Sequence, residues 1–267
     1  MNYKDIPAYE ADFRARGKDS DGKQFALSPQ KVVIPNTADS FEVVTANLAN
    51  GDKSFYYQEE KAKQRIVVHF TAGYLKGDLA ALTKKDNHVS TPFVVARDGT
   101  IYQLFASKYW SYHLGKGAQG GNQQMSSSAV AIELSNVAYL REKNGNLVDP
   151  YGAFYCSTAD QDAYQKVSTA YRGYSTFATF TDAQYKSLIN LLRYLTATYK
   201  IPAAFVPEAQ RYDVYQDVAT FKGITTHVNY QPQSYGKWDI GPAFDWTRVM
   251  AGVQTVAVPP IATPAPA

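Results

Sequence analysis

Two continuous apolar runs constrain the fold of this chain more than any other feature of its sequence. Residues 65–70 read Arg-Ile-Val-Val-His-Phe, and residues 129–135 read Ala-Val-Ala-Ile-Glu-Leu-Ser. A short β-branched run without polar alternation is typical of a strand that is buried on both faces of its sheet. The two runs therefore predict the centre of a β-sheet.

The remaining segments complete an α/β pattern. Residues 92–96 and 100–105 are apolar runs joined through Asp98-Gly99, a pair that favours the positive φ angles of a tight hairpin turn. A capping-box pattern at 181–184 begins a helix that is expected to run to about residue 200. Shorter elements are expected at residues 31–35, 41–44, 78–82, 223–228 and 246–250. Strands interleaved with helices imply an α/β fold with a mixed central β-sheet flanked by helices.

The same pattern suggests three parts of unequal size. Residues 46–250 are expected to form the main domain, and residues 1–45 an extension that packs on it. Within the domain, residues 136–179 carry an Asn-Gly turn and many aromatic side chains, and are interpreted as an elaborated loop or lid. Residues 251–267 are rich in proline and alanine, as in a tail or linker.

Composition excludes several classes of protein. A net charge of +3 is too small to indicate nucleic-acid binding, although it is compatible with an anionic polymer. No stretch approaches the roughly 20 apolar residues of a membrane span, and the N-terminus lacks a secretory signal, so we expect synthesis in the cytoplasm and no membrane partner. The single cysteine, Cys156, allows no internal disulfide. The 21 tyrosines suit either a carbohydrate or peptide groove or the core.

Two of the four histidines occupy the ends of predicted strands. His69 ends the first buried run and His227 ends another, and in open α/β sheets functional groups gather at such ends. Each alone is better explained by a hydrogen-bonded structural histidine. Asp239 follows His227 by twelve residues, near a Gly-Pro turn, and two histidines with one carboxylate match the ligand count of a catalytic zinc. Lys237 projects beside Asp239 if the backbone is extended, and would stabilise an oxyanion or simply pair with the carboxylate.

Glu133 lies inside the second buried run. An unpaired carboxylate is costly to bury, so this side chain needs either an ionic partner or a polar site. Two interpretations stay open: a buried salt bridge, or a general base for an attacking water.

Five segments in order resemble the zinc amidases of the type 2 N-acetylmuramoyl-L-alanine amidase family, which is related to peptidoglycan recognition proteins and phage endolysins. The similarity lies in Ile66-Val-Val-His-Phe-Thr-Ala-Gly73, in the predicted hairpin at 90–104, in His-Leu-Gly at 113–115, in Ala-Ile-Glu-Leu-Ser-Asn at 131–136, and in residues 227–246 with their Lys-Trp-Asp-Ile-Gly-Pro. One departure is Pro92, where the family often has histidine.

The resemblance implies a role for each matching residue. His69, His227 and Asp239 would bind Zn²⁺, with Glu133 and Lys237 as the catalytic carboxylate and cation. A further set is assigned to the substrate groove: His113, Thr71 and Arg172. His88 matches nothing and is interpreted as a surface histidine.

The resemblance further implies hydrolysis of the amide bond between N-acetylmuramic acid and L-alanine, with bacterial peptidoglycan as the partner of a monomeric chain. The extra segments favour an endolysin-type enzyme that acts on the cell wall after phage-type release. Three alternatives stay open: a cytoplasmic muropeptide-recycling amidase, a non-catalytic peptidoglycan-binding module and a zinc peptidase that cuts within the stem peptide.

Overall fold

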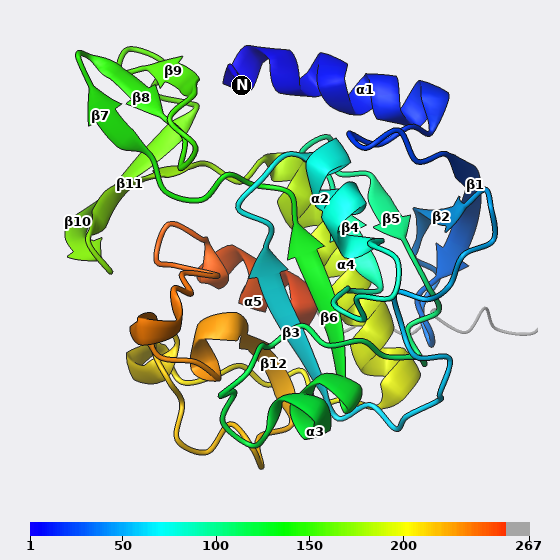
Figure 1. Ribbon diagram of the computed structural model, residues 1–267. Helices are drawn as coiled ribbons and strands as arrows, with labels where there is room; N and C mark the ends of the chain where they lie inside the picture. The colour runs from blue at the N-terminus through cyan, green and yellow to red at the C-terminus, as the bar shows by residue number, and fades with distance from the viewer. Residues whose placement is uncertain (255–267) are drawn as a thin grey trace, which may run out of the picture.

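A seven-stranded mixed sheet forms the centre of the computed structural model, which describes residues 1–254 apart from the side chain of Gln233 (Figure 1). In sheet order the strands are β1 (Phe25–Val33), β2 (Ser40–Leu48), β5 (Ile101–Gln103), β4 (Phe93–Val95), β6 (Ala129–Leu134), β3 (Arg65–Phe70) and β12 (Gly223–Thr226). The four strands from β4 to β12 are parallel, whereas β5 pairs antiparallel with β4 as the Asp98-Gly99 turn predicted. The predicted mixed sheet is confirmed.

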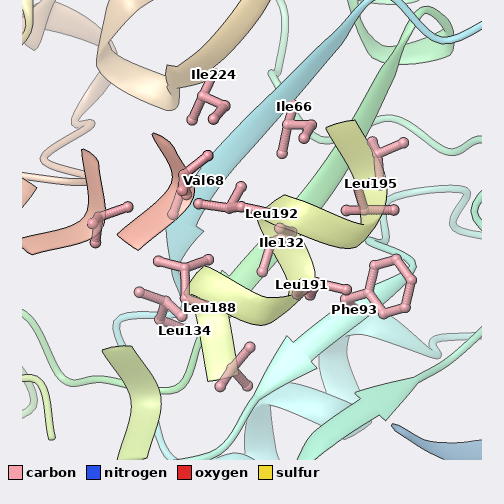
Figure 2. Close-up of a cluster of buried hydrophobic side chains, with 14 of the residues drawn as sticks. Ile66, Val68, Phe93, Ile132, Leu134, Leu188, Leu191, Leu192, Leu195 and Ile224 are labelled. Atoms are coloured by element: carbon pink, nitrogen blue, oxygen red, sulfur yellow. The ribbon is translucent and has the colours of Figure 1, made fainter. Parts of the chain in front are cut away.

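Helices cover both faces of this sheet. On one face, α4 (Asp182–Tyr199) packs a leucine row against alternate residues of β3, β4 and β6, as Figure 2 shows. On the other face, α1 (Ile6–Arg16) and α2 (Leu75–Leu82) bury Phe13, Leu75 and Leu79 against β2, β4 and β5. Burial on both sides explains why β3 and β6 lack polar alternation.

The predicted capping box begins α4. The Thr181 hydroxyl accepts a hydrogen bond from the Gln184 backbone N–H at 3.1 Å, and the Gln184 side chain accepts one from the Thr181 N–H. Lys200 ends the helix in the left-handed conformation. Two shorter helices complete the set, α3 (Asn122–Ser127) and α5 (Trp246–Gln254).

The first two strands are longer than the sequence predicted, and they join the central sheet. The expected strands 31–35 and 41–44 are parts of β1 and β2, and the division drawn between residues 45 and 46 falls inside β2. β1 is an edge strand with mostly exposed side chains, including Pro29, so it carries little apolar signal.

Residues 136–179 are not the irregular loop that the sequence suggested. They form a three-stranded sheet and a two-stranded hairpin that stand to one side of the central sheet (Figure 1): β7 (Arg141–Lys143), β8 (Asn146–Val148) and β9 (Phe154–Ser157), then β10 (Tyr164–Tyr171) and β11 (Tyr174–Ala178). Leu147, Tyr155 and Cys156 are buried in a cluster of their own, which also includes Ile6. β7, β8 and β9 have only three or four residues, which is too few for a clear period, and none of the side chains of β10 is fully buried. The apolar pattern therefore missed them.

The C-terminal region ends in α5, which is longer than the predicted 246–250. The first residues of the proposed tail 251–267 belong to this helix, and the rest lie outside the described residues. Within residues 1–254, no helix combines the length and apolar composition needed to cross a bilayer.

Glu10 connects the N-terminal helix to the β4–β5 hairpin. Its buried carboxylate accepts hydrogen bonds from the backbone N–H groups of Arg97 and Asp98, each at 3.0 Å. Burial raises the pKa of Glu10 to about 7, and the two N–H groups oppose this rise. Folding therefore favours the protonated acid, so its contribution to stability is largest below pH 4.5 and is lost as the pH rises towards 7.

We expect Glu10→Ala to lower the free energy of unfolding by about 1–3 kcal/mol at pH 5, because two backbone donors lose their acceptor. Denaturant unfolding at pH 5 and pH 8 measures this loss, which should be smaller at pH 8. Glu42→Ala, which removes an exposed ion pair with Arg14, is the control and should change little. A loss that grows between pH 5 and pH 8 would contradict the proposed state of Glu10.

Candidate functional site

Three side chains converge at the carboxyl ends of neighbouring strands. His69 is the penultimate residue of β3, and His227 directly follows β12, the strand that pairs parallel with β3. Asp239 is held beside them because its carbonyl accepts the Val228 N–H at 3.0 Å. The Nδ1 atoms of both histidines lie 3.1 Å apart, and each is 3.0 Å from Asp239 Oδ2. The three side chains are buried and could hold a metal ion.

Neighbouring groups orient the two rings for this purpose. His227 Nε2 lies 3.1 Å from the Leu114 carbonyl, which only accepts, so Nε2 carries the proton and Nδ1 presents its lone pair. His69 Nε2 lies 3.1 Å from His113 Nδ1 and can donate to it in the same manner. Burial lowers the pKa of His69 to about 4, so its ring is neutral at pH 7. Two nitrogen lone pairs and a carboxylate oxygen that face one another match the donor set of a bound cation.

Glu133 lies next to this cluster because β6 pairs with β3 in the register that places it opposite His69. Burial raises the pKa of Glu133 well above its ordinary value, the carboxylates of Asp239 and Asp78 raise it further, and Lys237 lowers it. Its Oε2 atom is buried and has no hydrogen-bond partner among the described residues. The interpretation of Glu133 as half of a buried salt bridge is therefore not supported at this atom. The interpretation that Glu133 faces a polar site is retained.

A cavity of about 300 Å³ brings the candidate residues together. Its walls include six of the residues that the sequence singled out: Thr71, His113, Glu133, His227, Lys237 and Asp239. Ala138, Tyr139 and Trp238 line the same cavity. A second cavity of about 370 Å³ shares Thr71 and Glu133 with it.

Comparison with known protein families assigns the chain to a family. Residues 59–242 match the model of the N-acetylmuramoyl-L-alanine amidases, type 2. The chain belongs to this amidase family. The matched range contains every candidate metal and catalytic residue and excludes α1, β1 and β2. No curated protein sequence matches the chain.

Solved structures of amidases are similar to this member of the family. AmiD from E. coli, solved with anhydro-N-acetylmuramic acid-L-Ala-D-γ-Glu-L-Lys, has 22% identity and a TM-score of 0.46 over 73% of this chain and 59% of its own. AmpDh3 from Pseudomonas aeruginosa has 17% identity and a TM-score of 0.45 over 75% and 65%. PlyL has 13% identity and a TM-score of 0.43 over 80% and 97%. The chain thus spans about three fifths of the length of AmiD.

Arg172 is the groove candidate that the structure does not bring into the cavity of this amidase-family chain. Its side chain, 6% exposed, donates to the Lys237 carbonyl and pairs with Asp213 Oδ1 at 3.2 Å. The Trp238 indole N–H donates to the Arg172 carbonyl at 3.4 Å. Arg172 therefore holds the loop of Lys237 and Asp239 through hydrogen bonds to its backbone and to Trp238. It is not among the described residues that line the cavity.

Two residues that the sequence did not assign to the site, His88 and Cys156, are not part of the metal cluster. His88 is half-buried and stacks on Tyr57 with the ring centres 4.2 Å apart. Cys156 is buried, and burial raises the pKa of its thiol to about 11, as in an unreactive structural cysteine.

Proposed function

We propose that the chain hydrolyses the amide bond between N-acetylmuramic acid and L-alanine in peptidoglycan, with Zn²⁺ held by His69, His227 and Asp239. The observation that carries this proposal is the convergence of three ligand atoms within 3.1 Å at the strand ends. Glu133 and Lys237 line the same cavity, and membership of the amidase family supports the choice of bond.

The donor set suits zinc. Zinc binds histidine nitrogen at about 2.0–2.1 Å, so the ligand atoms around a tetrahedral ion are about 3.3 Å apart. The observed separations of 3.0–3.1 Å are close to this value. Three protein ligands leave a fourth position open, as in catalytic zinc sites.

Each polar residue then has a distinct task. Zinc, when bound, supplies Lewis acidity towards the carbonyl group and the attacking water. Glu133 takes a proton from that water and delivers it to the nitrogen of L-alanine as the C–N bond breaks. The Lys237 ammonium stabilises the negative charge that develops on the carbonyl oxygen. The oxygen of the water ends on the lactyl carboxylate of the muramic acid.

Removal of the metal tests the zinc requirement. A chelator should abolish the release of L-alanine amino groups from peptidoglycan, and one equivalent of Zn²⁺ should restore it. No new reducing sugars should appear at any stage, because glycosidic bonds stay intact. Full activity of the metal-free protein would contradict the proposal, and stoichiometric zinc without cleavage would favour a binding module.

We further propose an endolysin-type lytic role. The strands β7–β11, together with β1 and β2, enlarge the domain beyond the site itself, which suits an extended polymer better than a small fragment. Rates on intact sacculi and on soluble muropeptides test this role. Activity on the soluble fragments alone would support a recycling enzyme instead.

A further inference from the structure

Three aromatic side chains form a cluster, and two of them line the metal cavity. The rings of Tyr139 and Tyr174 stack with centres 3.6 Å apart, and the Trp238 ring centre lies 5.6 Å from Tyr139 and 6.3 Å from Tyr174. Tyr139 and Trp238 line the cavity, and Trp238 stands between Lys237 and Asp239 in sequence. We call these three residues the aromatic platform.

The aromatic platform is not explained by core packing. All three side chains are half-buried, whereas Phe177 and Ala178, at the end of the same strand as Tyr174, are fully buried. The aromatic rings therefore keep surface in contact with solvent beside the reacting groups.

The β10–β11 hairpin fixes the aromatic platform relative to the metal cluster. Tyr174 begins β11, two residues after Arg172 at the hairpin turn. The Arg172 guanidinium and carbonyl bond to Lys237 and Trp238, as described above. The platform is thus held at a set position relative to Asp239, as a subsite for a reacting substrate requires.

The chemistry of the platform indicates its ligand. Tyrosine and tryptophan rings present flat apolar faces with polar tips, and a pyranose ring presents an apolar C–H face with hydroxyl groups at its rim. The platform itself carries no charge. The second cavity, in contrast, has the carboxyl groups of Asp78 and Glu133 in its wall, which would suit a positively charged group rather than an uncharged sugar ring.

We propose that Tyr139, Tyr174 and Trp238 bind a sugar ring of the glycan strand next to the scissile amide. The assignment rests on the proposed function, because it places the sugar side of the amide bond where Tyr139 and Trp238 line the cavity. It gives the β10–β11 hairpin a role in substrate recognition.

A pair of substrates isolates the sugar contact in kinetics. One is a GlcNAc–MurNAc tripeptide, and the other is the same tripeptide on a lactoyl group without a sugar ring. Tyr174→Ala should lower the ratio of kcat/KM between them about tenfold, chiefly through KM, since the ring that stacks on Tyr139 is lost from the platform. Tyr174→Phe keeps the ring and should keep the ratio. Phe154→Ala, which removes an exposed aromatic side chain of β9, is the matched control. Equal losses on both substrates would overturn the proposal.

A binding measurement tests the aromatic platform without catalysis. Titration of Glu133→Gln with a peptide-free GlcNAc–MurNAc disaccharide should change the tryptophan fluorescence, and Trp238→Phe should remove that change. Adding Tyr174→Ala should weaken the binding about tenfold. Unchanged affinity after the loss of Tyr174 would overturn the platform, even if the amide is cleaved as proposed. Sugar binding with no cleavage by the wild type would sustain the platform and refute the hydrolytic function.

Discussion

Glu133→Gln is expected to lower kcat for amide hydrolysis by roughly a thousandfold while the protein keeps one zinc per chain. Glutamine has the shape of glutamate but cannot take a proton from water. Because Glu133 is not part of the ligand cluster, the substitution leaves His69, His227 and Asp239 in place. Steady-state kinetics together with metal analysis of the same sample measure both quantities.

Asp19→Asn is the matched control for this change. Asp19 is also a buried carboxylate, but it accepts backbone hydrogen bonds from Asp21 and Lys23, away from the cavity. Its variant should hydrolyse substrate at close to the wild-type rate once folded. If Glu133→Gln retained activity within tenfold of the wild type, Glu133 would not be the proton carrier.

Asp239→Asn is expected to remove stoichiometric zinc and, with it, nearly all activity. The substitution replaces the one negative ligand, so the two neutral imidazoles are left to bind the cation. Zinc that binds only the folded state raises stability by about 2.7 kcal/mol at a hundredfold excess over its Kd. Added zinc should therefore raise the Tm of the wild type and leave that of Asp239→Asn unchanged.

Histidine variants provide the controls for the ligand set. His88→Ala should bind zinc as the wild type does, because His88 stacks on Tyr57 outside the cluster. His113→Ala should also keep one zinc per chain, since His113 Nδ1 contacts Nε2 of His69 and not Nδ1, the atom of His69 that faces the other two ligands. Loss of zinc from His113→Ala would mean that His113 is itself a zinc ligand and would contradict the proposed ligand set.

The sequence predicted those parts of the fold in which one local pattern decides the structure. The uninterrupted runs of β3 and β6, the Asp98-Gly99 hairpin and the Thr181 capping box each have a single physical explanation, and all three are confirmed. The order of the strands then brings His69 and His227 together, so their strand-end positions were informative.

The remainder depends on contacts between distant segments. β1 is an exposed edge strand, and its place in the sheet follows from pairing with β2 rather than from any apolar pattern of its own. Arg172 was assigned to the groove, but the β10–β11 hairpin places its side chain against the backbone of Lys237, and it does not line the cavity. The stacking of Tyr139 on Tyr174 joins residues 35 positions apart (174 − 139). In the sequence, only the abundance of tyrosine was consistent with such an aromatic cluster.

Hydrolysis of a defined muramyl tripeptide in ¹⁸O-labelled water tests the central claim most directly. Attack of water on the lactyl carbonyl places one heavy oxygen in the muramic acid fragment and leaves an unlabelled peptide with a free L-alanine amino group. Mass spectrometry of the two products should show this distribution. A labelled muramic acid fragment that still carries L-alanine would mean that a bond within the stem peptide is cut, and would contradict the assignment as a muramoyl-alanine amidase.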